Sequence, residues 1–368
     1  SPGKIVPKGS IGISAWVEIL LGKFSFYNPT NRLINHLELS GIFLAPSTII
    51  DGMRKIKNLI EPCYELICEK NRLEERWNAD ETGWLVHEKI EGKESSKWYI
   101  WVFKSAYTVV YKLSKSRSAE TIKEHLGTDV DVILGCDRFS AYKKYAVDTE
   151  GGIDLAFCWA HVRRDFIRLG KAHDEHAEWA KQVVEVEIRE LYHLHANRKN
   201  AYLERETNPE EFEKLDNKFC QKMTAFLNRR KEELKNPDLA DCKRKVNESV
   251  VEHWQGLTVV IADPETEMDN NSAERALRGP VVGRKNFWGS MMQWSGQLAV
   301  MMFTLIQTLV LWGINPKSWL TWYFEECAKN KGKPPADVKS YLPWNLSQAD
   351  LEKLSLRQSN TMGTGPPS

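Results

Sequence analysis

The chain has few of the features that mark secreted, membrane or uniformly basic proteins. Its 51 Lys and Arg residues nearly balance its 50 Asp and Glu residues, so the formal net charge is +1. A polyanionic partner must therefore be bound by a local basic surface rather than by the charge of the whole chain. The seven cysteines show no repeated spacing, which argues against a secreted disulfide framework and for a reducing compartment. We therefore expect a cytosolic protein.

Long hydrophobic runs are also scarce. The one membrane candidate is LAVMMFTLIQTLVLW at residues 298–312, which contains Gln307 and two threonines. Because a membrane-spanning helix needs about 20 apolar residues, we expect a buried core helix and no membrane partner. The chain begins SPGKIVPKGS, without a Met or an apolar signal core, and this beginning indicates a cut or processed end.

The N-terminal part of the chain is rich in helical periodicity. Residues 31–72 predict two helices, separated by the turn SGIFLAPS, with Pro62 as a kink in the second. The pair resembles a helix-turn-helix. An ordinary helical hairpin is the reading we favour, because many helix pairs have a Gly in the turn and no role in DNA binding.

From residue 76 the pattern changes to strands. The segments RWNADETGWLVHEKI, SKWYIWVFKS and AYTVVYKLS predict a three-stranded antiparallel meander. A helix (SAETIKEHLG), a strand (VDVILGCD), a helix (around FSAYKKYA) and a strand (IDLAFCWAH) follow. The order predicts an α/β fold with a mixed sheet flanked by helices, in which Asp80 and Asp137 belong to strands that could be neighbours.

The strands then stop for roughly ninety residues of amphipathic, highly charged helices, which we interpret as an insertion with a mostly solvated surface. Next come LTVVIAD, the motif MDNNSAERALRGPVVGRKN, the apolar helix at 295–313, a helix at NPKSWLTWYFEECAK and a flexible tail, RQSNTMGTGPPS. We expect N-terminal helices over 1–75, a first core part over 76–165, the helical insertion over 166–256, a second core part over 257–313 and a C-terminal helix with its tail over 314–368.

Three acids stand in motifs of small and polar residues: Asp80 in NADETGW, Asp137 in GCDRFSAY and Glu274 in NNSAERALR. Taken alone, an acid at a strand end usually caps a turn, and an acid on a helix usually faces water. Together they are the hard oxygen ligands that two magnesium or manganese ions need in order to catalyse chemistry on a phosphodiester.

Four blocks in order carry a resemblance to a known family: ADETGW, CWAHVRRDF, DNNSAERALRGPVVGRKN and LIQTLVLWGINPKSWL. The chain resembles, from about residue 4 to residue 346, the DDE transposases of the insertion sequence sixty-six family. The resemblance implies a ribonuclease H-like fold in which Asp80, Asp137 and Glu274 are the catalytic and metal-binding triad, with two Mg²⁺ or Mn²⁺ ions. Glu81, beside Asp80, should point to the opposite side of the strand and is left out of the triad.

The resemblance also implies partners. They are DNA, both as transposon terminal inverted repeats and as target, further copies of the chain when it is bound to DNA, and accessory proteins of the same element, in the nucleoid of a bacterial cytoplasm. The chain departs from the family at Arg138 and Phe139, where members read Gly-Tyr, and the segment after GRKN is shortened to FWGS. The N-terminal zinc-binding and coiled-coil segments of such transposases are absent from this chain, so we expect incomplete recognition of transposon ends.

CWAHVRRDF places Cys158 and His161 three positions apart, with Arg163 and Arg164 just beyond. Zinc is one interpretation, but zinc needs about four ligands and no second pair of matching spacing follows. We favour a strand-to-helix junction that presents the two arginines to DNA. A buried cysteine with a hydrogen-bonded histidine is an alternative that we weigh at least as heavily as zinc.

The residues after Glu274 are strongly basic. Fixed cations suit phosphate contacts, which supply affinity and salt dependence rather than sequence specificity. Trp288 and Trp294 could stack on exposed bases, although core packing is the commoner role of a Trp. The cations that we expect to contact DNA here are Arg275, Arg278, Arg284 and Lys285.

The sequence supports a DNA transposase that cuts transposon ends and joins them to target DNA. Three alternatives stay open: a ribonuclease H-like nuclease or resolvase that only hydrolyses, a domesticated DNA-binding protein that keeps the fold, and a structural protein with all three acids solvated.

Overall fold

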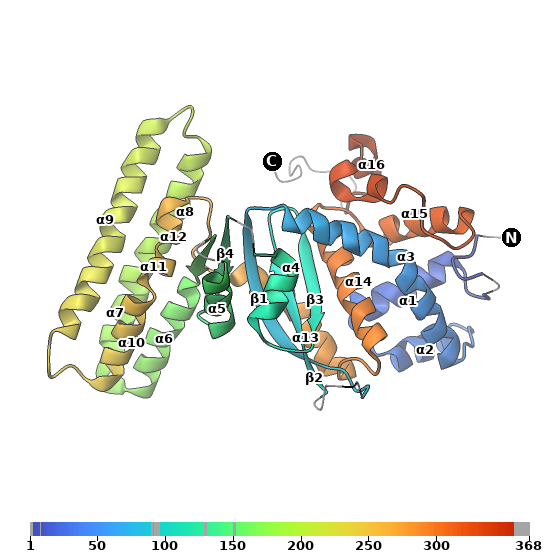
Figure 1. Cartoon of the computed structure of the whole chain (residues 1–368), viewed down its shortest axis with the longest axis horizontal. Coiled ribbons are helices and arrows are strands. Elements are labelled where there is room, and N and C mark those ends of the chain that lie inside the picture. Colours follow the sequence, from blue (N-terminus) through green and yellow to red (C-terminus); the bar gives the residue numbers. More distant parts are fainter. Residues whose placement is uncertain are drawn as a thin grey trace. The chain divides into compact units, whose positions relative to one another are not determined.

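The computed structural model describes residues 3–7, 9–89, 91, 96–128, 131–149 and 152–356. The predicted flexible tail at 357–368 lies outside these residues. The chain divides into two compact units, one made of Ser1–His125 with Ala273–Ser368 and the other of Leu126–Ser272. The fold is mixed α/β, with five strands among many helices in the described ranges (Figure 1).

The strands of the first unit form the predicted antiparallel meander. They are β1 (Arg76–Leu85), β2 (Lys97–Lys104) and β3 (Val109–Ser114), with β2 between the other two. In this register Asp80 lies opposite Val102, and Val102 lies opposite Tyr111. Directly opposed residues of antiparallel strands share a face, so these three side chains lie in one row.

Helices cover both faces of this meander. The face that carries Trp84, Val102 and Tyr111 belongs to the large hydrophobic core of the unit. On the other face, the ring of Phe103 lies 4.5 Å from the ring of His125 in α4 (Ala119–Leu126). Residues 100–103 of β2 are buried in an unbroken run, as expected for an apolar strand that is covered on both faces.

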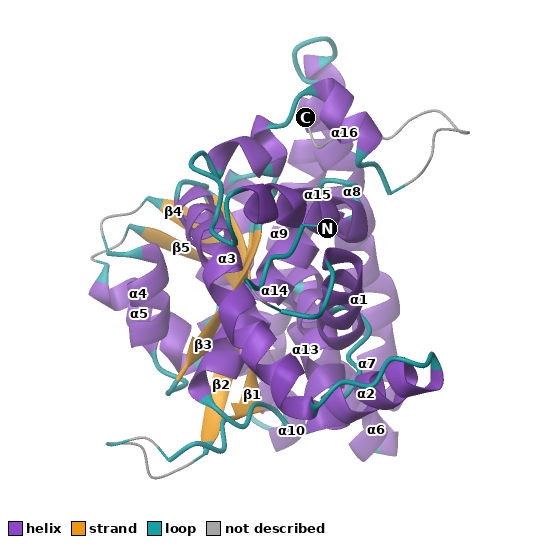
Figure 2. Cartoon of the chain, turned by 90° about the vertical axis from the view of Figure 1, so that its right-hand side faces the viewer, coloured by secondary structure: helices purple, strands orange, loops and turns teal. Residues whose placement is uncertain are grey.

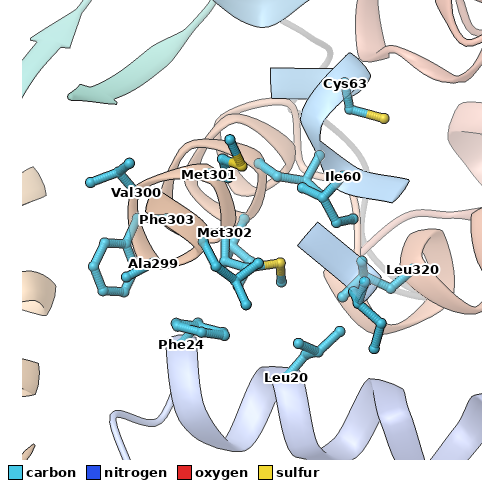
Figure 3. Close-up of a cluster of buried hydrophobic side chains, with 14 of the residues drawn as sticks. Leu20, Phe24, Ile60, Cys63, Ala299, Val300, Met301, Met302, Phe303 and Leu320 are labelled. Atoms are coloured by element: carbon cyan, nitrogen blue, oxygen red, sulfur yellow. The ribbon is translucent and has the colours of Figure 1, made fainter. Parts of the chain in front are cut away.

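The helical core of the first unit is built around one apolar helix, α14 (Gln293–Leu311) (Figure 3). Its side chains meet those of α1 (Ile13–Phe24), α3 (Pro46–Arg72) and α15 (Pro316–Lys329). The predicted N-terminal helix pair is confirmed as α2 (Thr30–Leu39) and α3, and α3 continues through Pro62. The unit also contains α13 (Asn271–Phe287), which begins at the boundary between the units, the short turns η3 (Lys339–Tyr341) and η4 (Pro343–Asn345), and α16 (Gln348–Lys353).

The two threonines of α14 form hydrogen bonds with backbone N–H groups on the outer edge of β3. Thr304 Oγ1 accepts from the backbone N–H of Tyr111 at 2.9 Å, and Thr308 Oγ1 accepts from that of Val109 at 3.2 Å. Among the described residues α14 is the one helix long and apolar enough to cross a membrane, but 67% of it is buried inside the protein. It is the core helix that the sequence predicts, and it lies along the strands in Figure 2.

The second unit contains one parallel strand pair and a set of long helices. Strands β4 (Val132–Cys136) and β5 (Ile153–Phe157) run parallel and are connected by α5 (Ser140–Asp148). The predicted last strand, IDLAFCWAH, is too long by four residues, because the N–H of Trp159 donates to Met268 O and α6 begins there. The helical elements are α6 (Trp159–Ala172), η1 (Asp174–His176), α7 (Ala177–Gln182), the π-helical η2 (Val183–Ile188), α8 (Arg189–Leu203), α9 (Pro209–Leu234), α10 (Asp241–Glu252), α11 (Trp254–Leu257) and α12 (Val259–Ala262).

We expect Thr304→Val to destabilise the first unit. Valine has the shape of threonine but no acceptor, so the buried N–H of Tyr111 loses its partner, at a cost of about 1 to 3 kcal/mol. Urea unfolding measures the loss. Thr304→Ser keeps the hydroxyl and should lose less than Thr304→Val, and equal stability of the Val variant and the native protein would contradict the role of this contact.

We also expect the protein to lose stability as the pH falls below about 6.5. Burial, with Lys112 and Arg72 nearby, holds the pKa of His125 well below its usual range, and its Nε2 lies 2.7 Å from Asn71 Oδ1. The unfolded chain takes up a proton near pH 6.5 and the folded one does not, so each pH unit below that value costs at most about 1.4 kcal/mol.

Urea unfolding between pH 7.5 and 5.5 tests this expectation, with His125→Gln compared with the native chain. Burial lowers the pKa of His195 and of His253 as well, so part of the slope should remain in the variant. His36 is exposed and provides the matched control. An unchanged slope in His125→Gln, or an equal change in His36→Gln, would show that His125 is not the group that titrates.

Candidate active site

Asp80 is half-buried in the middle of β1. Its side chain shares a row with Val102 and Tyr111 and therefore points to the face of the meander that packs on the helical core. Asp80 Oδ1 accepts from the N–H of Glu81 at 2.9 Å. The strand thus holds one carboxylate on the face that packs on the helical core, between Asn78 and Thr82 of the same strand face.

Glu274 lies in the first turn of α13 and is half-buried. An acid is favoured there, because the unpaired N–H groups of a helix N-terminus attract negative charge. The turn before the helix is fixed by Asp269, whose Oδ1 accepts from the N–H of Asn271 at 2.9 Å. The predicted helix start at the Asn-Asn pair agrees with the structure.

Two contacts hold α13 against the meander. The hydroxyl of Tyr111 donates to Ala276 O at 2.7 Å, two residues after Glu274. Near the other end of the helix, Arg284 Nη1 donates to Gly83 O at 2.6 Å. Tyr111 belongs to the row of Asp80, so the first unit carries Asp80 and the helix of Glu274 on one face of its strands.

Glu81 faces the other way. It lies opposite Trp101, and its carboxylate accepts from Arg117 Nε at 2.7 Å. The side chain of Glu81 is only 1% exposed, whereas that of Arg117 is 43% exposed. This pairing gives Glu81 a structural role on the strand face opposite to that of Asp80, the direction that the sequence predicts.

Asp137 belongs to the second unit and follows the last residue of β4 directly. Its Oδ1 accepts from the N–H of Phe139 at 2.9 Å and closes a tight turn. Arg138, the departure from the family pattern, donates to Ser249 Oγ at 2.7 Å and forms an ion pair with Asp165. The arginine therefore ties the loop of Asp137 to α6 and α10.

Cys158 occupies the junction between β5 and α6. Its N–H donates to Cys136 O, its carbonyl accepts from the N–H of His161, and its sulfur accepts from the N–H of Asn270 at 3.1 Å. Burial raises the pKa of the Cys158 thiol above its usual value. These contacts give Cys158 a structural role at the predicted strand-to-helix junction.

The cations that are predicted to contact DNA differ in how exposed they are, and therefore in how accessible they are to a DNA phosphate. Arg284 is half-buried and donates to β1, so it serves to fasten α13. Arg164 is half-buried at the start of α6, and Arg163 beside it is exposed. The exposed cations of α13 are Arg275, Arg278 and Lys285. Tyr111 is the residue of this site that the sequence did not reveal, because its contact to α13 spans 165 positions.

One half-buried acid, Glu274, and three exposed cations thus share α13. Comparison with known proteins identifies a family of this kind: residues 8–298 match the Transposase IS66 family. The match covers well over half of the chain, and the chain belongs to that family.

Three curated relatives from Sinorhizobium fredii (strain NBRC 101917 / NGR234) are also similar to the chain. The uncharacterized protein y4hP is 25% identical over 384 residues, which cover 97% of this chain and 66% of y4hP. The uncharacterized protein y4jD is 24% identical, covering 94% of this chain and 68% of y4jD, and y4qI is 25% identical, covering 86% and 63%. The chain therefore spans about two thirds of the length of these relatives.

Two substitutions at Asp137 should distinguish the contribution of its side-chain acceptor to the turn from the contribution of its negative charge. Asparagine keeps an oxygen that can accept from the N–H of Phe139, whereas alanine does not. We expect Asp137→Ala to lose about 1 kcal/mol of stability and Asp137→Asn to lose less than half of that. Thermal unfolding measures both, and equal losses would show that the turn does not depend on the side-chain acceptor.

Proposed function

We propose that the chain is the catalytic part of a DNA transposase, which cuts DNA at transposon ends and joins the freed 3′ ends to target DNA. The observation that carries the proposal is the common face of Asp80 and α13 in the first unit, in a member of a transposase family. Asp137 of the second unit completes the proposed triad with Asp80 and Glu274.

The proposed architecture is ribonuclease H-like, with residues 166–256 as a helical insertion. Three features support it. The antiparallel meander is followed by a parallel strand pair. Asp80 lies in β1, the first strand of the meander, and Asp137 directly follows β4, the first strand of the pair. The helices α6 to α12 then fill the interval before Glu274 without another strand in the described residues.

The three carboxylates fit divalent cations by the chemistry of their donors. Hard oxygen donors favour Mg²⁺ or Mn²⁺, and Asp80, Asp137 and Glu274 would hold two such ions. When bound, the ions supply activation of the attacking oxygen and stabilisation of the leaving oxygen. Protein groups set the geometry: β1 and the turn after β4 fix two acids, and Tyr111 with Arg284 fixes the helix of the third.

DNA is the proposed partner, as transposon ends and as target, with several copies of the chain on paired ends. The exposed Arg275, Arg278 and Lys285 would contact phosphates. Such contacts predict an affinity that falls steeply with salt, because each neutralised phosphate releases counterions.

The test uses the inverted repeats that flank the native reading frame, as pre-cut oligonucleotides, with a plasmid target and Mg²⁺ or Mn²⁺. We expect Asp80→Asn, Asp137→Asn and Glu274→Gln each to reduce joining about a thousandfold or more, because metal-bound charge stabilisation is worth several kcal/mol. Each variant should bind the same DNA with an affinity within a few-fold of that of the native chain.

Glu81→Gln is the matched control, since it removes the neighbouring acid on the opposite face. It should keep most of the joining activity of the native chain, measured on folded protein. Joining retained by Glu274→Gln would overturn the triad. Cleavage of intact ends without any joined product would favour a nuclease or resolvase that only hydrolyses.

A further inference from the structure

Two tryptophans follow α13: Trp288 is exposed in the loop after the helix, and Trp294 is partly buried in the first turn of α14. The side chain of Trp288 is 73% exposed. Trp294 packs against the hydrophobic core, and its ring centroid lies 4.9 Å from the guanidinium carbon of Arg54. Core packing thus accounts for Trp294 and leaves Trp288 without a structural explanation.

The backbone holds Trp288 in an unusual conformation. Its φ is +62°, in the left-handed region that favours glycine, and its N–H donates to Arg284 O at 2.9 Å. A residue with a Cβ is strained there, and such strain on a bulky side chain is concentrated at functional sites. A glycine at this helix end would be the low-energy choice.

The loop is also anchored firmly enough to keep this conformation. Ser290 forms a parallel bridge with Val86, just beyond the end of β1: its N–H donates to Leu85 O at 2.8 Å, and its carbonyl accepts from the N–H of His87 at 2.9 Å. Gly289 allows the close approach, because a Cβ there would lie 2.3 Å from Leu85 O. The carbonyl of Trp288 itself lies 3.1 Å from His87 Nε2. The indole is therefore presented by a rigid support.

The exposed residues of α13 lead to this indole. Arg275, Arg278, Val282 and Lys285 are exposed and follow one another at spacings of three and four, so they form one stripe along the helix. Trp288 comes three positions after Lys285. The stripe starts beside Glu274 and carries three cations, which complement the charge of a DNA strand.

We propose that Trp288 stacks on an unpaired base of the DNA strand whose phosphates follow the stripe. The inference rests on the proposed function and adds a base-binding residue to it. An indole offers a flat apolar surface to any base, while the cations hold the backbone. Glu274 and the end of α13 are about 20 Å apart along the helix, which corresponds to about six base steps of duplex.

The experiment measures binding in the Glu274→Gln background, so that no strand is cut. The probes are the fully paired transposon end and the same duplex with a single unpaired 2-aminopurine, placed in turn four to eight steps from the cut phosphate. Stacking quenches 2-aminopurine emission. We expect quenching at one or two adjacent positions, and loss of that quenching in Trp288→Ala.

Trp288→Ala should also weaken binding of the quenched duplex roughly tenfold and change binding of the fully paired duplex less than twofold. Trp288→Phe should restore part of both signals. Trp288→Gly tests whether lost quenching comes from misfolding. Glycine adopts the left-handed backbone freely, so this variant should unfold at a higher urea concentration than the native chain. It should nevertheless lose the quenching. Met291→Ala removes a side chain of the same loop that is 71% exposed and should leave quenching unchanged.

Unchanged quenching in Trp288→Ala would overturn the inference, as would an equal loss of affinity for paired and unpaired duplexes. An equal effect of Met291→Ala would overturn it too, since a general apolar contact would then explain the binding. The proposed function is judged separately: if Arg278→Ala and Lys285→Ala weaken all duplexes while Trp288→Ala weakens none, the inference alone fails. If the native chain binds no DNA, both fail.

Discussion

The first unit depends on hydrogen-bond partners for the backbone groups along the outer edge of β3. These groups are buried and must be paired, and no fourth strand of the unit pairs them among the described residues. Side-chain hydroxyls do so instead. Thr304 accepts from the N–H of Tyr111, and Tyr64 of α3 donates to its carbonyl at 2.9 Å. One residue of an edge strand thereby fixes two core helices.

The same residue connects this core to the candidate site. The hydroxyl of Tyr111 reaches Ala276 in α13, while Val102 connects Tyr111 to Asp80 across the strands. The position of the helix that carries Glu274 therefore depends on the packing of α14 and α3 against β3. In physical terms the acids of this unit and its hydrophobic core cannot be altered independently.

Sequence patterns predicted the elements well where the signal was local. The Trp- and Val-rich runs gave the meander, and NPKSWLTWYFEECAK gave α15 at its Asn-Pro start. The patterns failed where a contact between residues far apart in the sequence sets the end of an element or the role of a residue. The strand before Cys158 ended early because of a hydrogen bond to Met268, and Thr304 looked like an interruption of an apolar run although it pairs a strand. α1 lies in the segment 1–75 that was expected to be helical, but no pattern located it as a separate helix.

The candidate site shows the same division. The three acids came from motifs and from resemblance, but the row that joins Asp80 to Tyr111 follows from strand register. Arg284 and Lys285 are adjacent cations in the sequence, and only the structure assigns the first to β1 and leaves the second exposed. Likewise, no local pattern separates Trp288 from Trp294, because burial is decided by the whole unit.

The discontinuous first unit has a consequence for synthesis of the chain. β3 leaves the ribosome early, but Thr308, which pairs Val109, follows 199 positions later. At about 5 to 20 residues per second, the strand edge waits about 10 to 40 seconds for its partner. The second unit is continuous and is complete before α14 exists. The nascent meander thus has an interval in which its edge is open to other chains, and α14, which is made after the whole second unit, closes it.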